Sequence, residues 1–241
     1  MKKILLFFIA LAPCLFAQNY EEIYLKNGPS AVIEAIEKNI LSKDYWLKKL
    51  KDKDVRYGYY DNEILLSVVD KTDKELEVIS YKDGVTKKLF SSSVIVGKNG
   101  DKLLEGDLKT PVGVYQLTRR FTPNDRYLGP LAFSLSYPNL LDKLAKRNGS
   151  GIWIHGYPLD GQRTDELKTK GCVAMQNEIL MKFDEVIDHK KTLAFIYEDK
   201  RPEASANDIA VIISGILNWK KTWSESDIDS YLKFYDKDFE R

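Results

Sequence analysis

Short strand-like segments separated by turn signals fill the middle of the chain, from about residue 57 to residue 199. Residues 64–69 and 75–81 are rich in apolar and β-branched side chains, and Asp83-Gly84 follows them as a strong hairpin signal. Further expected elements are strands within 94–96, 112–117, 151–155 and 192–197 and a helix over 176–189. This pattern predicts a mainly β domain, a sandwich or a barrel-like sheet with one or two helices.

Helical patterns flank this β region on both sides. Apolar residues recur at helical spacing across 29–53, which predicts a helix or a helical pair. A polar linker at 200–205 precedes two more helical patterns, the first with an apolar stripe over 209–219 and the second capped by Ser224 or Ser226. Helices this apolar need a covering surface. We therefore expect them to pack on the β domain, to mediate dimerisation or another protein contact, or to begin a domain that is shortened here.

The N-terminus has the three-part layout of a secretory signal peptide. Met1-Lys2-Lys3 is positively charged, residues 4–11 form an unbroken apolar run, and Leu15-Phe16-Ala17 ends in a small residue. The run is shorter than the ~20 apolar residues of a membrane-spanning helix; a short uncleaved anchor is the alternative. The sequence therefore predicts export to the periplasm. The expected parts are a signal peptide (1–17), an N-terminal helical segment (18–56), the β domain (57–199) and a linker with C-terminal helices (200–241).

Charge and cysteine content narrow the range of functions that this chain could have. The chain has 37 Lys and Arg against 36 Asp and Glu, scattered among one another, so we expect no nucleic-acid partner. Of its two cysteines, Cys14 would leave with the signal peptide, which makes Cys172 the sole thiol of the mature chain. An unpaired thiol is a liability in an oxidising compartment. Cys172 is therefore a candidate reactive group, with an inert buried thiol as the alternative.

A histidine is available to activate this thiol. His155-Gly156 ends an apolar strand, and Cys172 follows Gly171 in a later segment. A thiol must be ionised to attack, and an imidazole can take its proton and later return it to the leaving group. The other histidine, His189, lies at a predicted helix end, so His155 is the expected general base. One cysteine and two histidines are few ligands for zinc, and we expect neither a metal nor a cofactor.

Three segments in a fixed order carry a family resemblance. They are Thr110-Pro111 through Tyr115, His155-Gly156, and Thr169-Lys170-Gly171-Cys172. Over about residues 62–198 the chain resembles the YkuD-type L,D-transpeptidases. The resemblance implies a mainly β catalytic fold and an acyl-enzyme on Cys172, formed at the meso-diaminopimelate–D-alanine bond of a peptidoglycan tetrapeptide. It also implies that the Gly156 carbonyl orients His155 and that backbone N–H groups around Gly171 and Cys172 form an oxyanion hole.

Two positions beside the cysteine depart from the family pattern. Lys170 stands where the family usually has His, and Ala174 stands where it usually has Arg. The C-terminal helices also resemble the start of an NTF2-like domain. Together these features are similar to the L,D-carboxypeptidases of helical Gram-negative bacteria, cell-shape determinants in which water resolves the acyl-enzyme. The resemblance therefore implies a carboxypeptidase that leaves tripeptides. The alternatives are an L,D-transpeptidase forming 3–3 crosslinks and a non-catalytic wall-binding protein.

The remaining candidates concern substrate binding. Lys170 favours the thiolate or binds a substrate carboxylate, unless it is simply solvated. Trp153 either faces the substrate or packs in the core. Arg163, in the loop between the histidine and the cysteine, is placed to bind an anionic substrate. With Gly171 and Ala174 these residues form the predicted contact set for peptidoglycan stem peptides, the expected partners.

Overall fold

The structure is a computed structural model and describes residues 19–161, 169–237 and 239. The predicted signal peptide and Arg163 lie outside the described residues. The chain divides into two units, one of residues 50–209 and one of the segments before and after it. Within the described part, no helix combines the length and apolar character that crossing a membrane requires.

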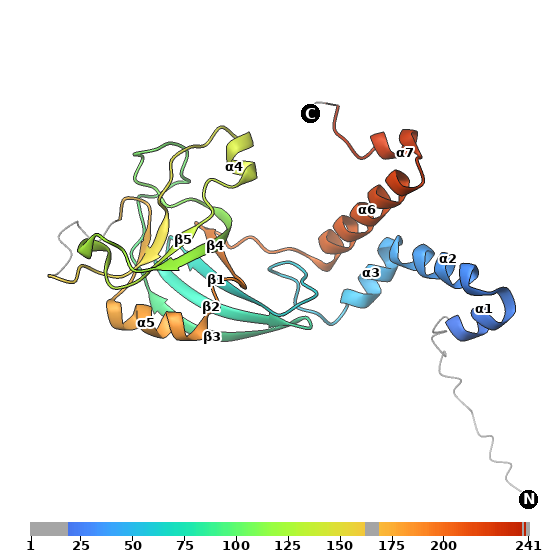
Figure 1. Cartoon of the computed structure of the whole chain (residues 1–241), viewed down its shortest axis with the longest axis horizontal. Helices are drawn as coiled ribbons and strands as arrows, with labels where there is room; N and C mark the ends of the chain where they lie inside the picture. Colours follow the sequence, from blue (N-terminus) through green and yellow to red (C-terminus); the bar gives the residue numbers. More distant parts are fainter. Residues whose placement is uncertain (1–18, 162–168, 238, 240–241) are drawn as a thin grey trace, which may run out of the picture. The chain divides into compact units, whose positions relative to one another are not determined.

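The larger unit is built on one eight-stranded sheet (Figure 1). Along the sheet the order is β3–β2–β1–β8–β4–β5–β6–β7. The pairs β1–β8 and β6–β7 are parallel and the other neighbours are antiparallel. The strands are β1 (Ile64–Asp70), β2 (Glu75–Lys82), β3 (Val85–Ser93), β4 (Gly113–Phe121), β5 (Ala132–Leu135), β6 (Trp153–His155), β7 (Val173–Ala174) and β8 (Thr192–Tyr197). The helices of this unit include η1 (Arg126–Leu128), α4 (Leu140–Leu144) and α5 (Asn177–Val186).

The two ends of this sheet meet. Ile95, which follows β3, exchanges both backbone hydrogen bonds with Ala174 of β7, at N–O distances of 2.7 and 2.8 Å. We call this bridge the seam. The mainly β domain that the sequence predicts is therefore a single sheet that curls back on itself. The predicted hairpin is also present, because Asp83 and Gly84 connect β2 to β3 with φ angles of 54° and 81°.

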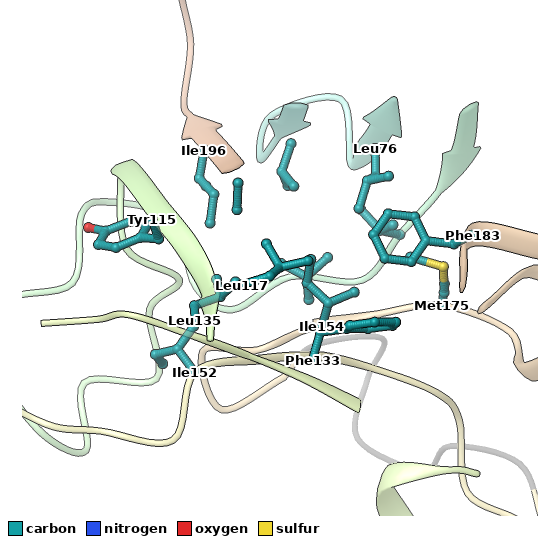
Figure 2. Close-up of a cluster of buried hydrophobic side chains, with 14 of the residues drawn as sticks. Leu76, Tyr115, Leu117, Phe133, Leu135, Ile152, Ile154, Met175, Phe183 and Ile196 are labelled. Carbon is teal, nitrogen blue, oxygen red and sulfur yellow. The ribbon is translucent and has the colours of Figure 1, made fainter. Parts of the chain in front are cut away.

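The core of the larger unit lies against this curled sheet. Figure 2 shows its aliphatic and aromatic side chains, contributed by β2, β4, β5, β6, β8 and α5. Ile152 and Ile154 are both buried in this cluster. Because successive side chains of a strand alternate between faces, Trp153 and His155 share the opposite face of β6. The core therefore fixes the direction in which the candidate base points.

The smaller unit is helical. It contains α1 (Tyr20–Asn27), α2 (Pro29–Ile40), α7 (Ile228–Leu232) and most of α3 (Lys43–Leu50) and α6 (Ala206–Ser224). The helical pair expected within 29–53 is present as α2 and α3. The N-cap of α7 is Asp227, whose carboxylate accepts from the Ser230 amide, so the predicted serine cap is wrong.

Hydrogen bonds join the C-terminal helix of this unit to its N-terminal helices. The Asn218 side chain donates to the Leu41 carbonyl at 2.9 Å, and Lys221 pairs with Glu37 at 3.1 Å. The segments 18–56 and 200–241, predicted as separate parts of the chain, thus pack on each other. Packing of the C-terminal helices on the N-terminal helices was not among the alternatives expected from the sequence.

Candidate active site

His155 is the last residue of β6 and is almost fully buried, at 2% exposure. Its Nδ1 atom lies 2.7 Å from the Gly156 carbonyl oxygen. A carbonyl oxygen can only accept, so Nδ1 carries the proton in this contact and Nε2 is left as the basic atom. The contact between His155 and the Gly156 carbonyl that the family resemblance implies is therefore present.

A side chain that the sequence analysis missed holds the turn after His155. Asn177, the first residue of α5, accepts a 2.8 Å hydrogen bond from the Tyr157 amide through Oδ1. This oxygen is so close that a Cβ added to Gly156 would lie 2.2 Å from it. Packing thus requires glycine at position 156, whose backbone carbonyl bonds His155. The only sequence signal for Asn177 is a polar residue at the start of the helix that follows the cysteine segment.

A hydroxyl group closes the loop that carries Cys172. Thr169 Oγ1 donates to the Cys172 carbonyl at 2.6 Å and accepts the Gly171 amide at 3.1 Å. Gly171 has φ +121°, and a Cβ there would lie 2.7 Å from the Lys109 carbonyl oxygen, so the position requires glycine. The bond to Thr169 competes with the oxyanion-hole role that the family resemblance implies for the Gly171 amide.

Cys172 and His155 line the same pocket, which has a volume of about 410 Å³. Cys172 is partly exposed, and its Sγ donates to the Gly151 carbonyl at 3.4 Å. The other lining residues are Asp125, Tyr127, Leu128, Thr169 and Lys170. The structure therefore brings the predicted nucleophile, the predicted base and Lys170 to one cavity.

The other predicted contact residues lie elsewhere. Ala174 is fully buried and its backbone forms the seam, so its side chain does not line the pocket. Trp153 is half-buried and lines a neighbouring pocket. Among the residues with described positions, no group of three or more His, Cys, Asp or Glu side chains is arranged to hold a metal ion.

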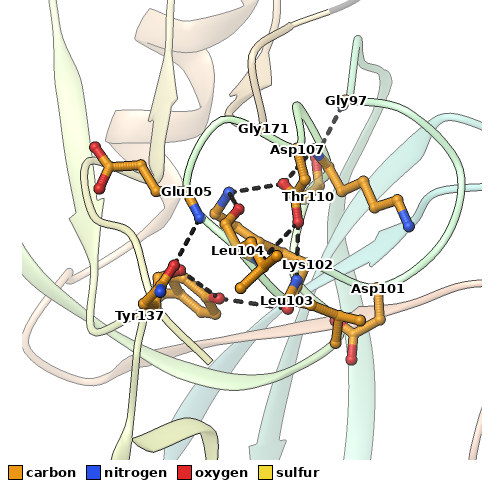
Figure 3. A network of polar contacts seen from close by, with 12 residues as sticks. Gly97, Asp101, Lys102, Leu103, Leu104, Glu105, Asp107, Thr110, Tyr137 and Gly171 are labelled. Atoms are coloured by element: carbon orange, nitrogen blue, oxygen red, sulfur yellow. Dashed lines mark hydrogen bonds and ion pairs between the residues drawn. The ribbon is translucent and has the colours of Figure 1, made fainter. Parts of the chain in front are cut away.

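A polar network anchors the segment on which the cysteine loop rests (Figure 3). Asp107 accepts from Lys102 at 2.8 Å and from the backbone amides of Leu103, Leu104 and Lys109. Burial raises the pKa of Asp107, but these hydrogen bonds outweigh burial and hold the pKa well below its usual range. Three residues further on, Thr110 Oγ1 accepts the Gly97 amide at 2.8 Å and lies 3.5 Å from the Cys172 carbonyl oxygen.

The fold and the pocket define a mainly β domain with a thiol and an imidazole in one cavity. Comparison with known proteins gives the family. Residues 66–196 match the L,D-transpeptidase catalytic domain (YkuD). The chain therefore belongs to the YkuD family of L,D-transpeptidase catalytic domains. Residues 211–241 match the Cds6 C-terminal NTF2-like domain.

Among the solved structures that resemble most of the chain are those of two proteins. The helical cell shape determining protein Pgp2 from Campylobacter jejuni is 48% identical over 83% of this chain and 71% of that one, with a TM-score of 0.79. Bd1075 from Bdellovibrio bacteriovorus is 27% identical over 78% of this chain and 69% of that one, with a TM-score of 0.59. No curated protein matches the chain.

Proposed function

We propose that this chain is a peptidoglycan L,D-carboxypeptidase that removes the terminal D-alanine from tetrapeptide stems and leaves tripeptides. The observation that carries the proposal is the pocket shared by Cys172 and His155 within an L,D-transpeptidase catalytic domain. Similarity to a helical cell shape determining protein supports a role in wall remodelling and cell shape. The signal-like segment at 1–17 supports export to the periplasm, where this substrate lies.

In the proposed reaction His155 Nε2 takes the proton of Cys172 Sγ. The thiolate attacks the diaminopimelate carbonyl carbon, and the oxyanion collapses to break the carbon–nitrogen bond. The leaving D-alanine amine takes its proton from the imidazolium, which leaves a thioester on Cys172. Water, deprotonated by the same imidazole, then attacks the thioester carbonyl carbon. The carbon–sulfur bond breaks, the thiolate takes back the proton from the imidazolium, and the tripeptide is released. The bond between Nδ1 and the Gly156 carbonyl supports this cycle because it keeps the proton on Nδ1 and orients the ring.

Water rather than an amine is proposed as the acceptor because of the residues around the nucleophile. Lys170, at the pocket, replaces the histidine usual in the resembled family, and Ala174, in the seam, replaces the arginine. An alanine side chain with no exposed surface cannot contact an acceptor peptide. An L,D-transpeptidase that forms 3–3 crosslinks is the competing activity.

Digestion of purified muropeptides tests the proposal. The enzyme should release D-alanine from disaccharide tetrapeptides and leave disaccharide tripeptides, measured by mass spectrometry. The Cys172→Ala variant should keep the thermal transition and lose this release. Accumulation of 3–3 crosslinked dimers would show that an amine is the acceptor. Turnover by Cys172→Ala would remove Cys172 from the nucleophile role.

A further inference from the structure

A second pocket of about 540 Å³ adjoins the one that holds Cys172. Its lining includes Arg119 and Phe121 of β4 and Trp153 of β6. Asp125 and Leu128 line both pockets, so the two cavities are neighbours. A ligand that enters the first pocket can therefore extend into the second.

The register of the sheet relates the two pockets. Phe121 is paired with Ala132, and Ala132 is paired with His155. In the same way Arg119 and Trp153 are both paired with Ser134. Directly paired residues present their side chains on the same face of a sheet. Arg119 and Trp153 thus form one row, and it lies two residues, about 7 Å, from the row that contains His155.

The Arg119 side chain is held in place by an aromatic ring. Its guanidinium carbon lies 4.0 Å from the centre of the Phe121 ring, and Trp153 meets Phe121 edge to face at 4.9 Å. In the described part of the chain no carboxylate pairs with this guanidinium, whereas the neighbouring Arg120 pairs with Asp184. The carboxylate of Asp125, the acid in the pocket lining, accepts the Tyr127 amide as the cap of η1.

We propose that the second pocket is a subsite for a carboxylate of the stem peptide, which Arg119 binds. This inference rests on the proposed function and extends it to substrate recognition. A planar guanidinium matches a carboxylate in geometry and charge. A tetrapeptide stem offers three such groups: the terminal carboxylate of D-alanine, the α-carboxylate of the D-isoglutamyl residue and the free side-chain carboxylate of meso-diaminopimelate. All three lie within two residues of the scissile bond, which agrees with a spacing of about 7 Å between the rows.

The test measures the affinity of four ligands for protein that carries Cys172→Ala, so that no turnover is needed. The ligands are the disaccharide tetrapeptide and the same molecule with D-isoglutamine, with a terminal D-alaninamide, or with the side-chain carboxylate of diaminopimelate amidated. We expect Arg119→Gln to weaken binding of the tetrapeptide about tenfold, the usual size for a charge-assisted hydrogen bond. One amidated ligand, the one lacking the bound carboxylate, should be unaffected by Arg119→Gln and so identify that carboxylate. Arg119→Lys should retain part of the affinity.

Arg120→Gln is the matched control, because Arg120 is adjacent on β4, points to the other face and is paired with Asp184. It should bind all four ligands as the parent does. The proposal is overturned if Arg119→Gln binds like the parent, or if it loses the same factor for all four ligands. Release of D-alanine by the enzyme that retains Cys172 is measured in a separate assay. Its absence would refute the proposed function, while a carboxylate-dependent effect of Arg119 would still stand.

Discussion

Asn177 Oδ1 accepts the Tyr157 amide at 2.8 Å, and through this bond the start of α5 holds the turn that orients His155. The two ends of the contact come from segments on either side of the cysteine loop. Substitutions in this turn should therefore affect catalysis without touching the substrate.

Gly156→Ala should lower both stability and the rate of D-alanine release. The new methyl group would lie 2.2 Å from Asn177 Oδ1 and 3.0 Å from Pro130 Cδ, so the turn must shift and displace the carbonyl that orients His155. We expect a loss of about 1–3 kcal/mol in the free energy of unfolding, measured by urea denaturation. Gly161→Ala is the control, since no atom of the described residues lies within 4 Å of its new methyl group. Equal effects of the two variants would contradict the packing argument.

Asn177→Ala should lower kcat more than it raises KM. It leaves the Tyr157 amide without its acceptor, at a cost of about 1–3 kcal/mol, and frees the turn after His155. Asn177→Asp keeps an acceptor oxygen at the same position and should restore most of the rate. Steady-state kinetics of D-alanine release measures both. If aspartate is no better than alanine, the hydrogen bond to Tyr157 is not what matters.

Thr169→Val should reduce kcat by about tenfold, because the variant keeps the shape of threonine but removes the hydroxyl that bonds Gly171 and Cys172. Thr169→Ser retains the hydroxyl and should remain active. The rate of thiol alkylation by iodoacetamide reports on the loop independently of substrate. An active Thr169→Val enzyme with unchanged alkylation would show that this hydroxyl is dispensable.

Asp107→Asn should destabilise the chain near neutral pH by about 3 kcal/mol, because it leaves the buried Lys102 ammonium without its counter-charge. The folded pKa of Asp107 is lowered, so its contribution is complete above the unfolded pKa near 4 and is lost as the pH falls below that value. The difference between parent and variant in urea denaturation should therefore shrink below pH 4. A difference that stays constant from pH 7 to pH 3 would contradict this assignment.

Local sequence patterns were sufficient for much of the fold. The hairpin at Asp83-Gly84, the strands β1, β2 and β8 and the helix α5 follow from turn chemistry and side-chain periodicity. Short strands that are stabilised mainly by pairing with distant strands were not predicted. β5 has four residues and β7 has two, too few for a periodic signal, and the expected strand at 94–96 is reduced to the bridge at Ile95. Packing of α6 on the N-terminal helices is likewise a long-range outcome that no local pattern encodes.

The candidate site could likewise be predicted only in part from the sequence. Cys172 and His155 could be proposed as nucleophile and base from the sequence because few residue types perform this chemistry and the sequence has one cysteine beyond the signal-like segment. Arg119 and Asn177 could not be predicted as site residues. The role proposed for Arg119 depends on the register of β4 to β6, and that of Asn177 depends on the position of α5. Ala174 illustrates the converse, since proximity in sequence to Cys172 suggested substrate contact and the seam buries it.

The seam also ties catalysis to the completion of folding. It joins Ile95 to Ala174, residues far apart in sequence, and such non-local contacts generally form after hairpins and helices. The cysteine loop adjoins this bridge, so a chain in which the bridge had not formed would carry the thiol without the geometry to use it. Under the proposed function, the chain would trim stem peptides only once its sheet has closed.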